Sequence, residues 1–168
     1  MPLQDERCRI SKIELCESSV IRRSAEIELE RRVAISDLIE DNRFRPIADM
    51  GDDCQGPFQL SLSIQDVRLV FDISSDSGAP LATLTLPLQP FRKIIKEYFI
   101  ICESYFSAVK NHISPSRIEA IDMGRRGIHN EGSEKLKEML SDRVIMDMDT
   151  ARRLFTLVCV LNFRPQMP

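Results

Sequence analysis

Residues 58–86, FQLSLSIQDVRLVFDISSDSGAPLATLTL, contain three runs in which apolar and polar side chains alternate. This period of two is typical of strands with one buried face. A two-residue turn at Asp66-Val67 brings only apolar residues opposite one another: Ile64 with Leu69, Leu62 with Phe71 and Leu60 with Ile73. A second turn at Ser77-Gly78 does the same for Phe71 with Leu84 and for Leu69 with Leu86. The stretch therefore predicts a three-stranded antiparallel meander with one apolar face. Val67 suits the positive φ of a tight hairpin turn poorly, which leaves the turn type open.

The opposite face of this meander is polar. It carries Gln59, Ser61, Ser63, Gln65, Arg68, Asp72, Thr83 and Thr85. Such a face is expected to stay hydrated or to meet a hydrophilic partner. Edge strands of the sheet could pair across a dimer axis, so a homodimer or a protein partner is a candidate assembly.

The remaining elements follow from periodicity and capping signals. Residues 7–16 predict a strand in which Ile10 is out of phase, as at a bulge or an edge. Residues 24–41 predict a helix capped by Ser24, and residues 42–57 show no clear period. The best helix, residues 90–110, is expected to cover the sheet and form the middle of the core. Further predicted elements are helices at 114–123, 131–140 and 149–162 and a strand at 144–148. The last helix is apolar nearly all round, so it is expected to be buried or covered by a partner.

These elements together predict one α+β domain over residues 1–168, with a mostly antiparallel sheet and helices on one face. The net charge of −3 and a pI near 5.5 argue against general nucleic-acid binding. The five cysteines are odd in number and none has CxxC spacing, which argues against a disulfide framework or a zinc site and favours a reducing compartment. With no signal peptide and no membrane-length apolar run, we expect a cytoplasmic protein with no cofactor and no resident metal.

Three longer stretches carry a family resemblance: PFRKIIKEYFIICESYF in residues 90–106, DMGRRGIHNEGS in residues 122–133 and DTARRLFTLVCVLNF in residues 149–163. With them the chain resembles uncharacterised protein family 0262, from the first helix through residue 163. The resemblance implies a small, soluble bacterial protein. It carries over no activity, cofactor or partner.

The segment Gly124–Ser133 is the candidate functional site. Three of the six glycines fall within it, together with Arg125, Arg126, His129 and Asn130. A glycine-rich turn running into a helix start would leave backbone N–H groups free to attract an anion. The ligand residues expected in that case are Arg125, Arg126, Gly127, His129, Asn130 and Ser133.

Three functions remain open for this segment. The leading hypothesis is a non-enzymatic binding or interaction protein that holds a small anionic ligand there. The second is a small enzyme acting on a phosphorylated or carboxylated metabolite, with His129 as base, Asp122 or Glu131 orienting it and Arg126 binding the substrate. The third is a structural adaptor, in which glycines cap helices and both arginines pair with internal carboxylates.

Two other groups of residues have simpler interpretations. Asp49, Asp52 and Asp53 could hold a hard cation, but a flexible acidic loop explains them better because the calcium-loop pattern is absent. Cys102 and Cys159 fall in apolar helix stripes and are expected to be buried structural thiols.

Overall fold

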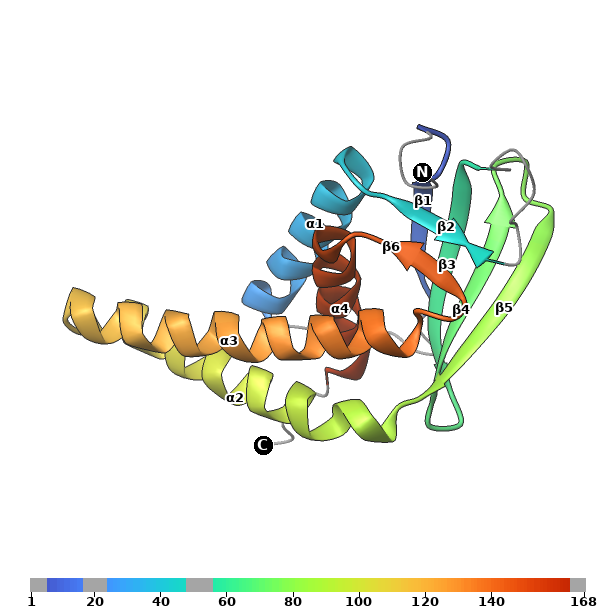
Figure 1. Ribbon diagram of the computed structural model, residues 1–168. Helices are drawn as coiled ribbons and strands as arrows, with labels where there is room; N and C mark the ends of the chain where they lie inside the picture. The colour runs from blue at the N-terminus through green and yellow to red at the C-terminus, as the bar shows by residue number, and fades with distance from the viewer. Residues whose placement is uncertain (1–5, 17–23, 48–55, 164–168) are drawn as a thin grey trace.

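The structure is a computed structural model that describes residues 6–16, 24–47 and 56–163. It is an α+β fold in which a sheet stands on one side of a group of helices (Figure 1). Its elements in chain order are β1 (Ile10–Leu15), α1 (Ala25–Glu40), β2 (Phe44–Pro46), β3 (Phe58–Gln65), β4 (Arg68–Ser75), β5 (Pro80–Pro87), α2 (Gln89–Lys110), α3 (Pro115–Met139), β6 (Val144–Met146) and α4 (Met148–Asn162).

The main sheet has the order β1-β3-β4-β5, and the predicted meander forms its larger part. Every predicted pair is confirmed, including Leu62 with Phe71 and Phe71 with Leu84. Asp66 and Val67 both have positive φ, at 49° and 57°, so the tight turn forms although Val67 suits it poorly. β1 adds to the meander as a parallel edge strand, and the register shift between Ile10 and Lys12 confirms the expected irregularity.

The interval 42–57 is not irregular throughout, as the sequence suggested. Residues 44–46 form β2, which pairs antiparallel with β6 in a second, two-stranded sheet. Three residues are too few to show a period, which is why the pattern missed this strand. The acidic residues Asp49, Asp52 and Asp53 lie outside the described residues.

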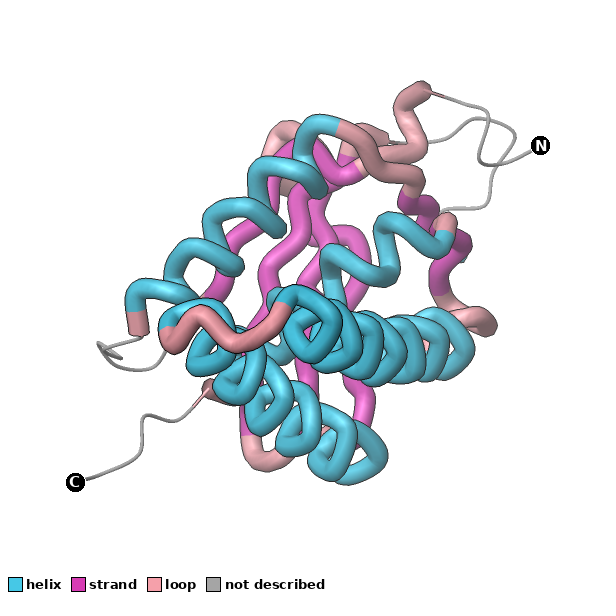
Figure 2. Tube along the Cα trace, turned by 90° about the vertical axis from the view of Figure 1, so that its left-hand side faces the viewer, coloured by secondary structure: helices cyan, strands magenta, loops and turns pink. Residues whose placement is uncertain are grey.

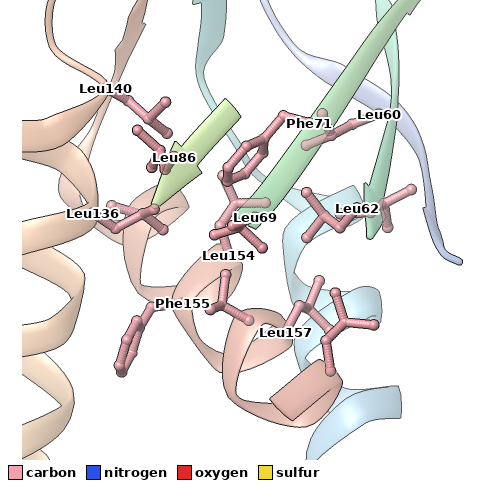
Figure 3. Packing of buried hydrophobic residues seen from close by; sticks show 14 of the residues in the cluster. Leu60, Leu62, Leu69, Phe71, Leu86, Leu136, Leu140, Leu154, Phe155 and Leu157 are labelled. Atoms are coloured by element: carbon pink, nitrogen blue, oxygen red, sulfur yellow. The ribbon is translucent and has the colours of Figure 1, made fainter. Parts of the chain in front are cut away.

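The centre of the core is α4 rather than the helix at residues 90–110. The side chains of α4 are buried on almost every face, which confirms that this helix is internal. Figure 3 shows Leu154 and Leu157 of α4 close to the inward side chains of the sheet, including Leu69. The helix α2 instead pairs with α3, and both project beyond the sheet in Figure 1. The inner part of the apolar stripe of α2 does join the core, including Phe91 and Tyr98. The prediction that α2 forms the middle of the core was wrong, because the outer part of the stripe faces α3 and solvent, with Ile100 56% exposed.

A further correction concerns α3. The sequence predicted two short helices separated by a break at residues 124–132, but α3 runs unbroken from Pro115 to Met139. None of the glycines in that interval has positive φ, so none of them caps a helix. Gly132 has a packing role, since a Cβ atom there would lie 2.1 Å from Cζ of Phe155 on α4. Glycine at this position allows α3 to approach α4 closely.

One buried polar side chain fastens the first strand to the helical layer. Asn42 is 3% exposed and follows the end of α1. Its amide nitrogen donates to the carbonyl oxygens of Ile10 and Leu38, and its Oδ1 accepts from the Ile10 N–H at 2.6 Å. The two bonds to Ile10 satisfy backbone groups of the edge strand, and the bond to Leu38 ties that strand to the end of α1.

Figure 2, turned by 90° from Figure 1, shows the helices in front of the strands, which places them in a layer over one face of the sheet. Among the helices in the described ranges, none combines the length and the hydrophobicity needed to cross a bilayer.

Candidate functional site

Because α3 is continuous, the anion site that the sequence predicted has no helix start to supply free N–H groups. The backbone amides of residues 124–133 are engaged inside a 25-residue helix. An anion can therefore be held in this segment by side chains only. The arginines remain the relevant groups.

Four arginines line one hollow of about 570 Å³, which we call the arginine hollow. Arg125 and Arg126 come from α3, and Arg152 and Arg153 come from α4. α1 and α3 both pack against α4, and the hollow lies between these helices. Its basic side is therefore assembled from segments that are almost 30 residues apart in the chain.

The six predicted ligand residues divide into two groups. Arg125, Arg126, His129 and Asn130 line the arginine hollow, because the spacing i, i+1, i+4, i+5 selects one face of a helix. Gly127 and Ser133 do not line it. Ser133 is fully buried, and its hydroxyl donates to the carbonyl oxygen of His129 at 2.7 Å.

Arg125 is held in place by its neighbours. Its Nε and one terminal nitrogen donate to Oδ1 of Asp122, at 3.1 and 2.6 Å. The other terminal nitrogen lies 3.7 Å from Glu30 on α1, and the guanidinium lies 4.6 Å from the centre of the Tyr105 ring. This cation thus links three helices, and much of its donor capacity is used.

Arg126 is in a different position. Its side chain is 63% exposed, and its Nε lies 3.2 Å from Oδ2 of Asp122. Within residues 6–16, 24–47 and 56–163, its two terminal nitrogens have no protein partner. A guanidinium presents its donors in a flat fork, so Arg126 can still bind a carboxylate or phosphate.

The arginines of α4 are partly occupied. Arg152 donates to Oδ1 of Asn130 at 3.0 Å and to Asp149 at 2.7 Å. Arg153 donates to the carbonyl oxygen of Asp41, at the end of α1. Of the two, Arg152 is the one for which the structure shows an acidic partner.

His129 lies on the inner side of the hollow. Its ring lies between those of Tyr98 and Phe155, tilted by 53° from the first and edge-on at 73° to the second, with both centroid distances at 5.4 Å. Nε2 lies 2.7 Å from the hydroxyl of Thr156, which in turn lies 3.2 Å from the carbonyl oxygen of Arg152. A hydroxyl that donates to the carbonyl accepts from Nε2–H, so the two bonds together require the proton on Nε2.

This environment keeps His129 uncharged. Burial, reinforced by the positive charges of Arg125 and Arg152, lowers the pKa of His129 to about 4. The structure does not show the carboxylate partner that the enzymatic hypothesis requires. Asp122 pairs with Arg125 and Arg126, and Glu131 lies on the exposed side of the helix.

Two further ionisable groups interact with residues of the hollow: Glu30, which lines it, and Cys102, which interacts with Glu30, Tyr98 and Arg125. Burial raises the pKa of Glu30, while Arg125 and a hydrogen bond from Tyr98 act in the opposite direction. Burial, together with the charge of Glu30, raises the pKa of Cys102 to about 12, which keeps the thiol protonated. Cys102 and Cys159 are both buried, as expected for structural thiols.

Sequence reasoning missed the α1 side of the hollow and the hydroxyl of Thr156. Leu29, Glu30, Val33, Ala34 and Asp37 supply the α1 side. The available signal was that Leu29 and Val33 are apolar residues one turn apart in this helix. Among the described residues, no group of histidine, cysteine and acidic side chains is arranged to hold a metal ion.

Comparison with known proteins places this architecture in a family. Residues 7–164 match the model of an uncharacterised protein family, UPF0262. A UPF0262 protein of Paramagnetospirillum magneticum is 52% identical over 158 residues, covering 94% of this chain and 98% of its own. One from Rhizobium etli is 54% identical over 148 residues, with 88% and 91% covered, and one from Ruegeria is 55% identical over 156 residues, with 92% and 98% covered. No solved structure matches the chain. The match over nearly the whole chain and the identity above one half show that this protein belongs to the UPF0262 family.

Proposed function

We propose that this protein is a non-enzymatic, cytoplasmic binding protein that holds a small anionic ligand in the arginine hollow. One observation carries the proposal: guanidinium groups from α3 and α4 line the same hollow, together with the amide of Asn130 and the hydroxyl of Thr156. Arginine is the side chain best suited to carboxylates and phosphates, because its paired N–H groups match two oxygens at once.

The arginines have separate roles in this proposal. Arg125 is fixed by Asp122, Glu30 and Tyr105, so it sets the positive potential and the shape of the site. Arg126 supplies the terminal nitrogens that meet the ligand. Glu30 and Asp37 also line the hollow, which restricts binding to an anion that stays close to the arginine side.

Binding is favoured over catalysis because neither His129 nor Cys102 is suited to proton transfer at neutral pH. His129 has a pKa of about 4 and its Nε2 is engaged by Thr156. A base this weak removes a proton from a metabolite poorly. Cys102 is a protonated thiol under the same conditions. The enzymatic alternative that uses His129 as its base is therefore disfavoured.

The adaptor alternative also has one observation in its favour. Arg125 is paired with internal carboxylates, which is what a purely structural role predicts. The two alternatives differ at Arg126, whose terminal nitrogens would serve no purpose in an adaptor. The experiment therefore uses that residue.

A thermal-shift screen with phosphate, nucleotides, sugar phosphates and dicarboxylates tests the proposal. A ligand at one hundred times its Kd should add about 2.7 kcal/mol of stability, which corresponds to roughly 5–10 °C in a chain of this size. Arg126→Ala should remove the shift, and Arg126→Lys should keep only part of it because the fork is lost. Arg117→Ala is the matched control, since Arg117 is an exposed arginine of α3 outside the hollow.

The result has a clear interpretation in either direction. Loss of the shift in Arg126→Ala alone, with an unchanged melting temperature of the free protein, would support the site. A flat screen, or a shift that survives Arg126→Ala, would overturn the proposal. A flat screen combined with a marked destabilisation by Arg126→Ala would favour the adaptor.

A further inference from the structure

The arginine hollow has two chemically different sides. Opposite the arginines, α1 presents Leu29 and Val33, which are 55% and 49% exposed. They are four residues apart and so lie one above the other on the same face of the helix. Ala34 lies beside them and also lines the hollow. The α1 side therefore offers a short apolar strip that lines the same hollow as the arginines, so that one ligand can contact both.

The dimensions of the hollow indicate a small molecule. Its volume of about 570 Å³ falls in the range of roughly 300–1,000 Å³ that is usual for small-molecule sites. The apolar strip between Leu29 and Val33 is about 6 Å long, from the rise of four helical residues. A strip of this length covers a short hydrocarbon chain.

Charge restricts the ligand to one anionic group. The Glu30 side chain also lines the hollow on the α1 side, is 18% exposed and lies 3.7 Å from Arg125. A second negative group placed there would face this carboxylate in a poorly hydrated position. An apolar chain meets no such repulsion along Leu29 and Val33, while the anionic end stays at Arg126.

We infer that the ligand of the arginine hollow is an amphipathic anion: one carboxylate or phosphate group bound at Arg126, joined to a short apolar chain that lies along Leu29 and Val33. This inference rests on the proposed function and specifies its ligand class. It predicts that affinity depends on the length of the chain as well as on charge.

Calorimetric titration with acetate, butanoate, hexanoate and octanoate tests the inference, with neutral hexanol as a probe without charge. Full burial of a methylene strengthens binding about fourfold. A strip that covers one side of the chain should give about half of that free energy, or roughly twofold tighter binding per methylene. The gain is expected to level off near hexanoate to octanoate, where the chain exceeds the strip, and hexanol should bind far more weakly than hexanoate.

Polar substitutions separate the strip from the arginines. Leu29→Gln with Val33→Thr should keep the binding of acetate and lose most of the dependence on chain length. Val33→Thr alone should lose part of the dependence of affinity on chain length. Because threonine has a shape similar to valine and position 33 is half-exposed, this single variant should fold normally even if the double variant does not. Ile100→Gln is the control, because Ile100 is equally exposed on α2 but lines a separate groove.

The outcomes distinguish the two proposals. If no anion binds, the proposed function fails and this inference falls with it. If anions bind through Arg126 with the same affinity at every chain length, the proposed function stands and the amphipathic ligand is overturned. A chain-length gain that persists in the double variant, or that Ile100→Gln removes, would also overturn it.

Discussion

Two glycines of α3 provide a direct test of how this helix is built. Gly127 has open space around it, with no atom within 4 Å of an added Cβ. At Gly132 the same atom would lie 2.1 Å from Cζ and 2.5 Å from Cε1 and Cε2 of Phe155. We therefore expect Gly127→Ala to stabilise the protein and Gly132→Ala to destabilise it, although both replace glycine by the best helix former.

The magnitudes follow from two opposing contributions. Alanine is favoured over glycine in a helix interior by about 0.8–1 kcal/mol, which applies in full at Gly127. At Gly132 it is opposed by the displacement of a fully buried aromatic ring, and overpacking of this kind costs about 1–3 kcal/mol. Each kcal/mol corresponds to about 2–4 °C for a chain of this size. The expected change is thus a rise of roughly 2–4 °C for Gly127→Ala and a fall of a few degrees for Gly132→Ala.

Urea denaturation followed by circular dichroism measures both variants, and the melting temperatures give a second reading. The two substitutions are identical in chemistry and lie in one helix, so each serves as the control for the other. A loss of stability in Gly127→Ala would contradict the continuous helix and restore a glycine-dependent turn at this position. A stability of Gly132→Ala as high as that of Gly127→Ala would contradict the close contact between α3 and α4.

Two further predictions concern buried polar groups. The pKa of His129 is lowered from 6.5 in the unfolded state to about 4 in the folded state, so the unfolded state binds more protons between these two pH values. The free energy of unfolding is therefore highest above pH 6.5, and up to about 3 kcal/mol of it is lost as the pH falls towards 4. Urea titrations at pH 7, 5.5 and 4.5 should show this slope in the parent protein and a smaller one in His129→Gln; equal slopes would refute the uncharged, buried imidazole. Asn42→Ala should cost about 2–4 kcal/mol in unfolding free energy, because the backbone groups of Ile10 lose their buried partner. A loss no larger than that of Asn111→Ala, an exposed amide, would show that water replaces these bonds.

Local sequence patterns predicted the structure correctly wherever the deciding interactions join residues that are close together in the chain. The register of β3, β4 and β5 could be predicted pair by pair, because a two-residue turn and an apolar period of two leave one self-consistent alignment. The cap of α1 by Ser24 and the buried character of α4 are of the same kind. In each case the deciding interactions are a few residues apart.

Prediction failed where a distant contact outweighed a local preference. Glycines at 124, 127 and 132 suggested a break, since glycine is a poor helix former. The packing of Gly132 against Phe155 explains why a glycine belongs inside this helix, and the contacts of α3 with α2 and α4 outweigh the intrinsic cost. The prediction that α2 forms the middle of the core failed for the same reason, because a long apolar stripe does not show which neighbouring element covers it.

The candidate site depends both on local sequence patterns and on tertiary packing. The sequence by itself determined that Arg125, Arg126, His129 and Asn130 share one short segment, and helical spacing then puts them on one face. Only the tertiary structure brings Arg152, Arg153 and Thr156 to the same hollow and adds Leu29 and Val33 from α1 to its lining. The same packing buries His129, which lowers the pKa of its imidazole. The physical reason is range: periodicity and capping act over a few residues, whereas the shape, charge and hydration of a site depend on helices that meet only when α1 and α3 pack on α4.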